Sequence, residues 1–333
     1  MNSTGKLGVG PMSSQIIEAV FRYSSSHQIP LMLIASLNQI NYLSGYVNSW
    51  TTKKFIQHIS LLRRKYPQAK VFICRDHCGP GFYSKLNTLK EIYRSIDSDL
   101  ENGFNLLHID FCHLSGGKDE ILNQSQKAIE YIRKNSPRTL IEIGTDENTG
   151  AQLTDAKKIE QEMKYFTSRG KIHFFVSQTG SLIKEMNQIG RFNPKFIRKV
   201  KPIADKFGVK LKEHNADYLQ GQDIKLRKGL ISAVNVAPQF GLLQTSLALQ
   251  KSLTYGVDAS DFLNAAYSSG KWKKWLHTNT HHNKLLCSLV AGHYVFSGVA
   301  YRRLHTKINL HENFDETIIN ETVKTIDLYI KNL

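Results

Sequence analysis

The chain has 333 residues, of which 41% are hydrophobic and 22% are charged, the balance of a water-soluble globular protein. No apolar run reaches the roughly 20 residues that a membrane span needs, and the first residues lack the apolar core of a signal peptide. We therefore expect a cytoplasmic protein that does not bind membranes. Lys and Arg outnumber Asp and Glu by 44 to 28, a formal net charge of +16 that points to an anionic partner or to a solvated basic surface.

Short apolar segments alternate with helix-like segments along the first two thirds of the chain. The apolar, β-branched runs lie at 7–10, 31–36, 71–76, 105–111, 139–144, 172–178, 209–214 and 232–237. Amphipathic segments lie between them at 14–23, 52–64, 86–100, 123–134, 155–168 and 194–207. Strand followed by helix, repeated about every 30 residues, predicts an α/β protein, and eight such units favour a (β/α)8 TIM barrel over an open sheet.

Two further features support the barrel. The predicted strands are almost continuously apolar, as strands buried on both faces are. Gly8 and Gly10 in the first predicted strand lack a third glycine, and no complete glycine-rich motif follows that strand, which argues against a dinucleotide-binding fold. After residue 237 the pattern predicts only helices, at 242–255, 259–266, 271–277, 284–296 and 316–332. We expect a barrel over residues 1–240 and a C-terminal helical extension over residues 241–333 packed on it.

Polar side chains stand where the apolar runs end. In a barrel the carboxyl ends of the strands meet at one rim, where active sites lie. The polar residues at these ends include Asn38, Asp76, His77, Asp110, Asp146, Gln178, His214 and Asn235. The pattern predicts a functional site at this rim.

Asp76 and His77 are the first candidates for chemistry, because a carboxylate and an imidazole leave a buried strand together. Such a pair can place a metal ligand beside a proton-transfer group. His214 ends a later strand and is a second candidate ligand, and further ligands must come from facing strands. For the remaining ligands we consider Glu142 and Gln178, with Asp110 and Asp146 on the same rim.

The loops after the last two predicted strands are candidates for substrate binding. Asn215 and Asp217 follow one strand and Asn235 ends the other, in the region where barrel enzymes often hold a phosphate on backbone N–H groups. Lys212 offers a rival chemistry, since a desolvated lysine at a barrel strand can form a Schiff base with a carbonyl.

Several segments resemble one known family. They are Ser-Leu-Asn-Gln-Ile-Asn from residue 36, Asp-His-Cys-Gly-Pro from residue 76, Gly-Phe-Asn-Leu-Leu-His-Ile-Asp from residue 103, Ile-Gly-Thr-Asp from residue 143 and Glu-His-Asn-Ala-Asp-Tyr from residue 213. In this order they resemble the accessory (non-catalytic) subunits of class II D-tagatose-1,6-bisphosphate aldolase, which are related to the metal-dependent class II ketose-bisphosphate aldolases.

The resemblance implies a (β/α)8 barrel and a site that binds a divalent metal, Zn²⁺ above all. It makes Asp76 the acid/base and His77 and His214 metal ligands. The third histidine of the catalytic enzymes has no counterpart in the segment 177–180, which reads Ser-Gln-Thr-Gly. We therefore expect Glu142 or Gln178 to complete the ligand set, Asp146 to be a second catalytic group, and Asn38, Gln39 and Asn41 to bind substrate with the loop residues above.

Three classes of function remain open from the sequence. The first is a lyase, an aldolase-type enzyme of carbohydrate metabolism acting on a sugar phosphate, or an epimerase on the same barrel. The second is an accessory subunit that stabilises a separate catalytic aldolase. The third is nucleic-acid binding through the basic surface, which we expect less than a sugar phosphate substrate. We also expect a homo-oligomer.

Overall fold

The computed structural model describes residues 4–146, 150 and 155–333, and its main sheet is a closed barrel. Parallel strands follow one another around it in the order β1-β2-β3-β4-β5-β6-β9-β10, and β10 pairs with β1. They are β1 (Leu7–Val9), β2 (Leu31–Ser36), β3 (Val71–Cys78), β4 (Leu106–Asp110), β5 (Leu140–Gly144), β6 (Phe174–Val176), β9 (Lys210–Glu213) and β10 (Ala233–Val236). The predicted (β/α)8 barrel is confirmed.

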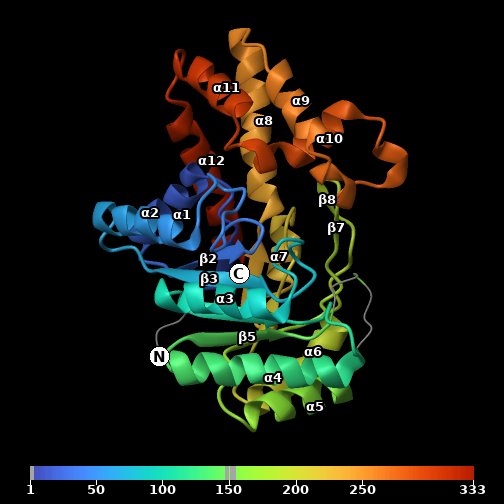
Figure 1. Ribbon diagram of the computed structural model, residues 1–333. Helices are drawn as coiled ribbons and strands as arrows, with labels where there is room; N and C mark the ends of the chain where they lie inside the picture. Colours follow the sequence, from blue (N-terminus) through green and yellow to red (C-terminus); the bar gives the residue numbers. More distant parts are fainter. Residues whose placement is uncertain (1–3, 147–149, 151–154) are drawn as a thin grey trace.

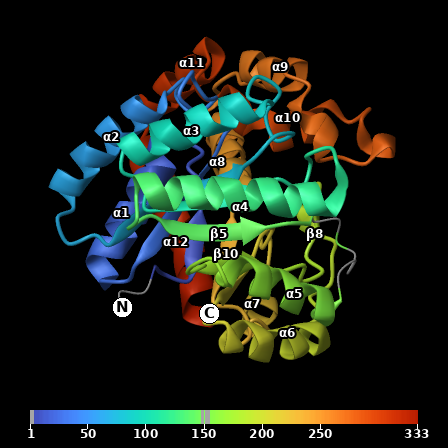
Figure 2. The same ribbon diagram turned by 60° about the horizontal axis from the view of Figure 1, so that its bottom comes forward.

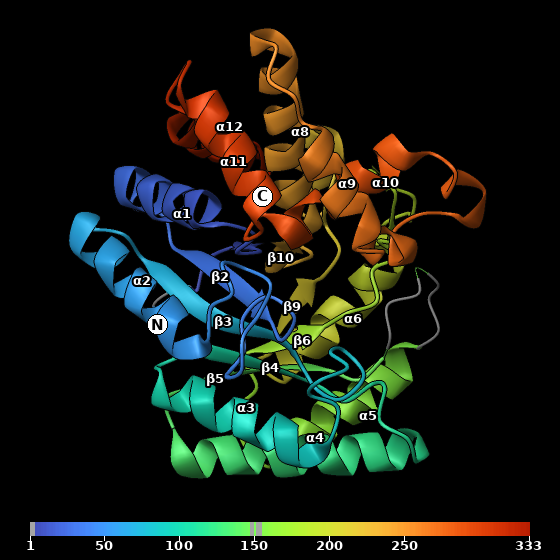
Figure 3. The same cartoon turned by 45° about the horizontal axis from the view of Figure 1, so that its top comes forward.

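Helices surround the barrel on its outside (Figure 3), and Figure 2 shows α4 running alongside β5. They are α1 (Ser14–His27), α2 (Thr52–Lys65), α3 (Leu89–Glu101), α4 (Gly117–Asn135), α5 (Ala156–Thr167) and α6 (Pro194–Lys206). Polar side chains start several of them: Ser13, Thr51 and Asp155 each accept a hydrogen bond from a backbone N–H in the first turn. These caps fix the first residue of α1, α2 and α5.

The inside of the barrel changes from apolar to polar along the strands. Its apolar layer consists of Met32, Ile34, Cys74, Leu106, Phe174 and Ala233. Side chains alternate between the two faces of a strand, so His108 and Asp110 on β4 point the same way as Leu106. All three are at most 4% exposed. The next layer toward the carboxyl ends of the strands is therefore polar and buried.

The C-terminal part of the chain is helical, as predicted (Figure 1). Its helices are α8 (Pro238–Tyr255), α9 (Ser260–Ser268), α10 (Lys284–Ala291), α11 (Val299–Asn309) and α12 (Phe314–Asn332), with short 3₁₀ turns η1 (Lys271–Lys274), η2 (Thr278–Thr280) and η3 (Gly292–Val295). Helix α12 returns to lie beside α1 (Figures 1 and 3). Its Ile326 and Tyr329 belong to the barrel's own hydrophobic core. The division at residue 240 into two parts stays a prediction.

Three elements were not predicted. The hairpin of β7 (Ile183–Lys184) and β8 (Asn187–Gln188) and helix α7 (Gly221–Lys225) are too short for a periodic pattern. Helix α11 does carry such a pattern, because Tyr301, Leu304 and Ile308 are buried at helical spacing beside the basic pair Arg302–Arg303. Within the described residues, no helix is both long and apolar enough to span a membrane.

We predict that the barrel depends on α12 for stability. Replacing Ile326, which is fully buried in the barrel core, with Ala should lower the free energy of unfolding by about 2–5 kcal/mol. Leu328 on the same helix is 38% exposed and is the matched control, so Leu328→Ala should cost less than about 1 kcal/mol. Urea unfolding followed by circular dichroism measures both. Equal, small losses would show that α12 is not part of the barrel core.

Candidate metal centre

Four side chains at the barrel rim form a cluster suited to a metal ion. Asp76, His77, His108 and His214 bring one ligand atom each to within 4.8 Å of one another. Asp76 and His77 lie on β3, His108 lies on β4, and His214 directly follows β9. We call these four residues the rim cluster. The structure thus brings together three predicted residues and adds His108.

An irregularity in β3 allows two consecutive residues to face the same centre. Side chains normally alternate along a strand, which would point Asp76 and His77 to opposite faces. The pairing of β3 with β4 shifts register between Arg75 and Cys78, and His77 has a φ of +48°. A register shift of this kind re-aims side chains, and it is common beside active sites.

Two carboxylates fix the orientation of two imidazoles. His77 Nδ1 lies 2.7 Å from Asp110 Oδ2, and His214 Nε2 lies 2.7 Å from Glu142 Oε1. When each of these nitrogens donates its proton to its carboxylate, the other nitrogen of each ring carries a lone pair. Those two nitrogens, His77 Nε2 and His214 Nδ1, are 3.3 Å apart. Two lone pairs at that distance require a proton or a cation between them, which is the arrangement of metal-binding histidines.

His108 completes the rim cluster from β4. Its Nδ1 accepts a hydrogen bond from the backbone N–H of His77 at 3.3 Å and lies 3.5 Å from Asp76 Oδ1. Its Nε2 is buried and has no hydrogen-bond partner among the described residues. Gly144 on β5 makes room for this ring, because a Cβ at that position would lie 2.7 Å from His108 Nε2. Three imidazoles with a carboxylate beside them form a donor set that fits a divalent metal such as Zn²⁺.

The charges of the centre favour a cation. Burial alone would raise the pKa of Asp76, but the charges of His77 and His214 outweigh it and hold the pKa well below its usual range. Lys212 and the histidines likewise overcome burial and lower the pKa of Glu142 to about 2. Burial opposes protonation of His77, yet Asp76 and Asp110 raise its pKa to about 9. The carboxylates around the centre are therefore ionised at neutral pH.

His108 was missed in the sequence, although a signal for it exists. Asp110 was placed on the rim, and His108 lies two positions before it on the same predicted strand. Because strand side chains repeat their direction every second residue, placing Asp110 inside the rim also places His108 there.

Glu142, Gln178 and Asp146 lie beside the rim cluster rather than in it. Glu142 bonds to His214 and forms a buried ion pair with Lys212 at 2.6 Å. This pair occupies the ammonium group that a Schiff base would need. Asp146 forms an ion pair with Lys118 at 2.8 Å, and Gln178 Nε2 donates to the Asp146 carbonyl at 3.2 Å.

Five of the six predicted substrate-binding residues fall into three groups, and Asp217 follows below. Asn38, Gln39 and Asn215 line cavities that also touch His77. The Asn235 side chain lies 3.4 Å from Asp76 Oδ1 and 3.0 Å from His214 Nε2. Asn41 is buried and bonds to the backbone of its own loop, where its Oδ1 accepts from the N–H groups of residues 43 and 44.

The loops after β9 and β10 satisfy their own backbone amides. Asp217 Oδ1 accepts hydrogen bonds from the N–H groups of Ala237 and Gln239, both at 2.9 Å. The N–H of Tyr218 donates to the side chain of Gln239 at 2.7 Å, and that of Ala216 donates to a backbone carbonyl. These four amides therefore have partners within the chain, and Asp217 binds the two at the start of α8. A phosphate site in these loops stays a prediction.

Two cavities open onto the rim cluster. One, of about 190 Å³, is lined by His77, His108, His214, Asp146 and Gln178 among others. The other, of about 250 Å³, reaches from Asp76 and His77 to the helical extension. His77, Phe82 and Asn215 line both, and the Phe82 ring stacks on His77 at 4.6 Å.

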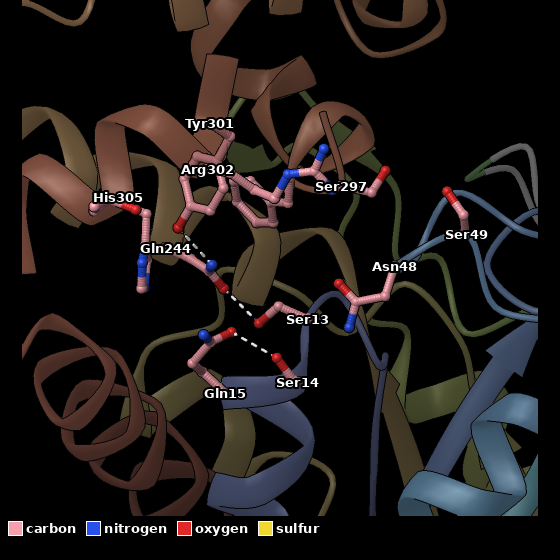
Figure 4. Close-up of a pocket in the computed structure, with 12 residues that line it drawn as sticks. Ser13, Ser14, Gln15, Asn48, Ser49, Gln244, Ser297, Tyr301, Arg302 and His305 are labelled. Atoms are coloured by element: carbon pink, nitrogen blue, oxygen red, sulfur yellow. Dashed lines mark hydrogen bonds between the residues drawn. The ribbon is translucent and has the colours of Figure 1, made fainter. Parts of the chain in front are cut away.

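A larger cavity of about 480 Å³ lies elsewhere, between the start of α1 and helix α11 (Figure 4). None of its lining residues lines either rim cavity. Its central polar groups bond to one another, since Ser13 donates to Gln244 and Gln244 donates to the Tyr301 hydroxyl, both at 2.6 Å. It offers none of the rim cluster's ligand atoms, so we place the candidate site at the rim.

A comparison with known families matches the first part of the chain. A family model described as D-tagatose-1,6-bisphosphate aldolase subunit GatZ/KbaZ-like matches residues 2–133, a segment that includes Asp76, His77 and His108. The family resemblance found in the sequence is thereby confirmed over that segment.

Solved structures share the fold at low identity. A probable tagatose 6 phosphate kinase from Sinorhizobium meliloti 1021 superposes with a TM-score of 0.80 at 14% identity, covering 99% of this chain and 100% of that one. The fructuronate-tagaturonate epimerase UxaE from Cohnella laeviribosi gives 0.65 at 13%, covering 98% and 82%. Fructose-bisphosphate aldolase from Campylobacter jejuni gives 0.59 at 14%, covering 90% of each chain. At these identities the likeness concerns the fold.

We predict that His108 is required for metal binding. His108→Ala should reduce the affinity for a divalent metal by about tenfold or more, because even the partners that orient metal-bound histidines are worth 10–100-fold. His113→Ala is the matched control, since His113 lines the same cavity without belonging to the rim cluster. Metal content after dialysis against defined free Zn²⁺ measures the effect. Unchanged content in folded His108→Ala protein would remove His108 from the centre.

Proposed function

We propose that this protein is a metal-dependent, aldolase-type lyase that acts on a phosphorylated ketose, similar to D-tagatose-1,6-bisphosphate aldolase. The rim cluster is the observation that carries the proposal, because it joins three imidazoles and a carboxylate at the end of a barrel where enzymes hold their sites. The family description over residues 2–133 and the aldolase and epimerase folds among the similar structures support it.

His77, His108 and His214 would hold the metal, and we propose Zn²⁺ for a set rich in imidazole. Bound there, the metal would supply Lewis-acid polarisation of the substrate carbonyl and the neighbouring hydroxyl. Asp110 and Glu142 orient two of the imidazoles and keep their outer nitrogens protonated. Neither carboxylate then has to move during the reaction.

Asp76 is the group we propose for proton transfer. It is ionised, lies 3.5–3.8 Å from the three imidazoles, and lines the cavity toward the extension. In the cleavage direction its carboxylate would take the proton of the substrate hydroxyl whose C–O becomes a carbonyl, and in synthesis it would return that proton. Asp146, paired with Lys118 in the other cavity, would be the second group able to exchange a proton with substrate or product.

A second function is favoured by the family description itself, which names an aldolase subunit. In that role the chain would bind and stabilise a separate catalytic aldolase chain, and the rim cluster would contribute to that assembly. A homo-oligomer, a cytoplasmic location and the division into residues 1–240 and 241–333 also stay predictions.

We predict that Asp76→Asn keeps the metal and loses turnover. The amide has the same size but cannot accept the proton, so the single-turnover rate should fall by about 10²- to 10⁴-fold. The measurement uses metal-loaded protein with D-tagatose-1,6-bisphosphate, other ketose bisphosphates and the corresponding triose phosphates. Asp261→Asn, on the exposed face of α9, is the control and should keep full activity.

Two results would change the proposal. Full turnover by Asp76→Asn would exclude Asp76 as the proton-transfer group. A metal-loaded parent that converts none of these substrates, but raises the activity or stability of a class II aldolase chain when the two are mixed, would favour the accessory function.

A further inference from the structure

The cavity between the rim cluster and the helical extension has walls from both parts of the chain. Asn38, Gln39, Asp76 and His77 line it from the barrel. Lys274, Trp275, His293 and Tyr294 line it from the extension. A molecule bound at the rim cluster can therefore touch the extension without leaving the cavity.

Lys274 differs from Lys212 and Lys118, the lysines beside the rim cluster, because it forms no ion pair among the described residues. Lys212 pairs with Glu142, and Lys118 pairs with Asp146. Among the described residues no ion pair is formed by Lys274, whose Nζ lies over the rings of Trp275 and Tyr294, 4.4 and 5.5 Å from their centres. Its positive charge is thus held at the cavity by aromatic faces and is available to a ligand.

Positive charge continues beyond Lys274. A neighbouring cavity of about 360 Å³ shares Asn38, Tyr46 and Tyr294 with the first and is lined by Lys85 and Lys271. The cavity at the rim cluster therefore has Lys274 on its extension wall and a basic cavity beside it, whereas its wall at the cluster carries Asp76. This polarity suits a ligand with an anionic group several atoms from the group that reacts.

His293 adds a neutral hydrogen-bonding group to the same wall. It is 2% exposed, and its Nδ1 has no hydrogen-bond partner among the described residues. Burial first, and then the nearby charge of Lys274, lower the pKa of His293 to about 3, so the imidazole is neutral. His293 therefore adds a buried, neutral imidazole to the wall that also carries Lys274.

Barrel enzymes often bind a phosphate on backbone amides in the loops after the last two strands. In this chain four of those amides already donate to Asp217, to Gln239 and to a backbone oxygen. A cationic side chain is therefore a stronger candidate than these four amides for binding a phosphate on the ligand.

We propose that Lys274, supplied by the helical extension, binds the phosphoryl group of the ligand whose carbonyl end lies at the rim cluster. This inference rests on the proposed function, which makes the ligand a ketose phosphate. It assigns to η1 of the extension a specificity-determining residue that selects phosphorylated over neutral sugars.

Lys274→Gln tests the inference, and Lys273→Gln is its matched control. Lys273 is the preceding residue of the same 3₁₀ turn and is exposed, but it does not line the cavity. The ligands are a ketose 1-phosphate, the same ketose without phosphate, and inorganic phosphate alone. Their dissociation constants for metal-loaded full-length protein are measured by titration calorimetry and by changes in the protein's tryptophan fluorescence.

We expect Lys274→Gln to weaken binding of the ketose phosphate and of inorganic phosphate by about 10- to 100-fold, the usual effect of losing a hydrogen bond between charged groups. Binding of the neutral ketose should not change. Lys274→Arg should restore most of the affinity, and Lys273→Gln should behave as the parent. Circular dichroism and metal content confirm that each variant is folded.

The inference is overturned if Lys274→Gln and Lys273→Gln bind the ketose phosphate equally, or if the parent binds neither phosphorylated ligand. Failure of the proposed function has a different signature. In that case the metal-loaded parent turns over no ketose phosphate. It still binds inorganic phosphate, and Lys274→Gln still weakens that binding.

Discussion

Two hydrogen bonds, from His77 to Asp110 and from His214 to Glu142, are the constraint on which the candidate centre depends. Each bond fixes one ring nitrogen as a donor and leaves the other as an acceptor facing the centre. The carboxylates are buried, so they need positive partners to offset their lost hydration. Glu142 has Lys212 on its other oxygen, whereas Asp110 depends on the imidazoles. Without bound protons or a cation the centre therefore carries excess negative charge. The carboxylates that orient the histidines thus also favour the binding of a metal ion.

The position of His77 shows how the barrel meets this requirement. A residue with φ of +48° costs about 1–2 kcal/mol relative to an ordinary strand conformation. The surroundings hold it there through the His77 N–H, which donates to His108, and through the bond to Asp110. Gly79, two residues later, lets β3 pass against β4, because a Cβ there would lie 1.6 Å from the carbonyl oxygen of Asp110. Local strain and one close backbone approach together bring a carboxylate and an imidazole of adjacent residues to one centre.

The fold and three of the four residues of the rim cluster could be predicted from the sequence because they follow from periodicity. Strand runs, their spacing and the polar residues at their ends are local patterns, and they located Asp76, His77 and His214. His108 follows from the same alternation once Asp110 is placed. The filled amides after β9 and β10 do not follow, because they depend on Asn215 and Tyr218 adopting φ near +60°, which turns Asp217 onto the start of α8. Residue types alone do not specify that conformation, so the sequence does not reveal that these amides already have partners.

The net charge of +16 is a property of the whole chain and says little about the centre, whose carboxylates Asp76, Asp110 and Glu142 make it locally acidic. The negative charge of the centre would repel a phosphorylated ligand. One cation between the ligand and the carboxylates, and a second cation beside the phosphoryl group, would offset this repulsion. A metal at the rim cluster would provide the first, and Lys274 is placed to provide the second. The helical extension then has two roles, one in the stability of the barrel and one at the cavity. Its last helix packs into the barrel core through Ile326, and its first turns after α9 bring a lysine to a cavity that the barrel leaves open on that side.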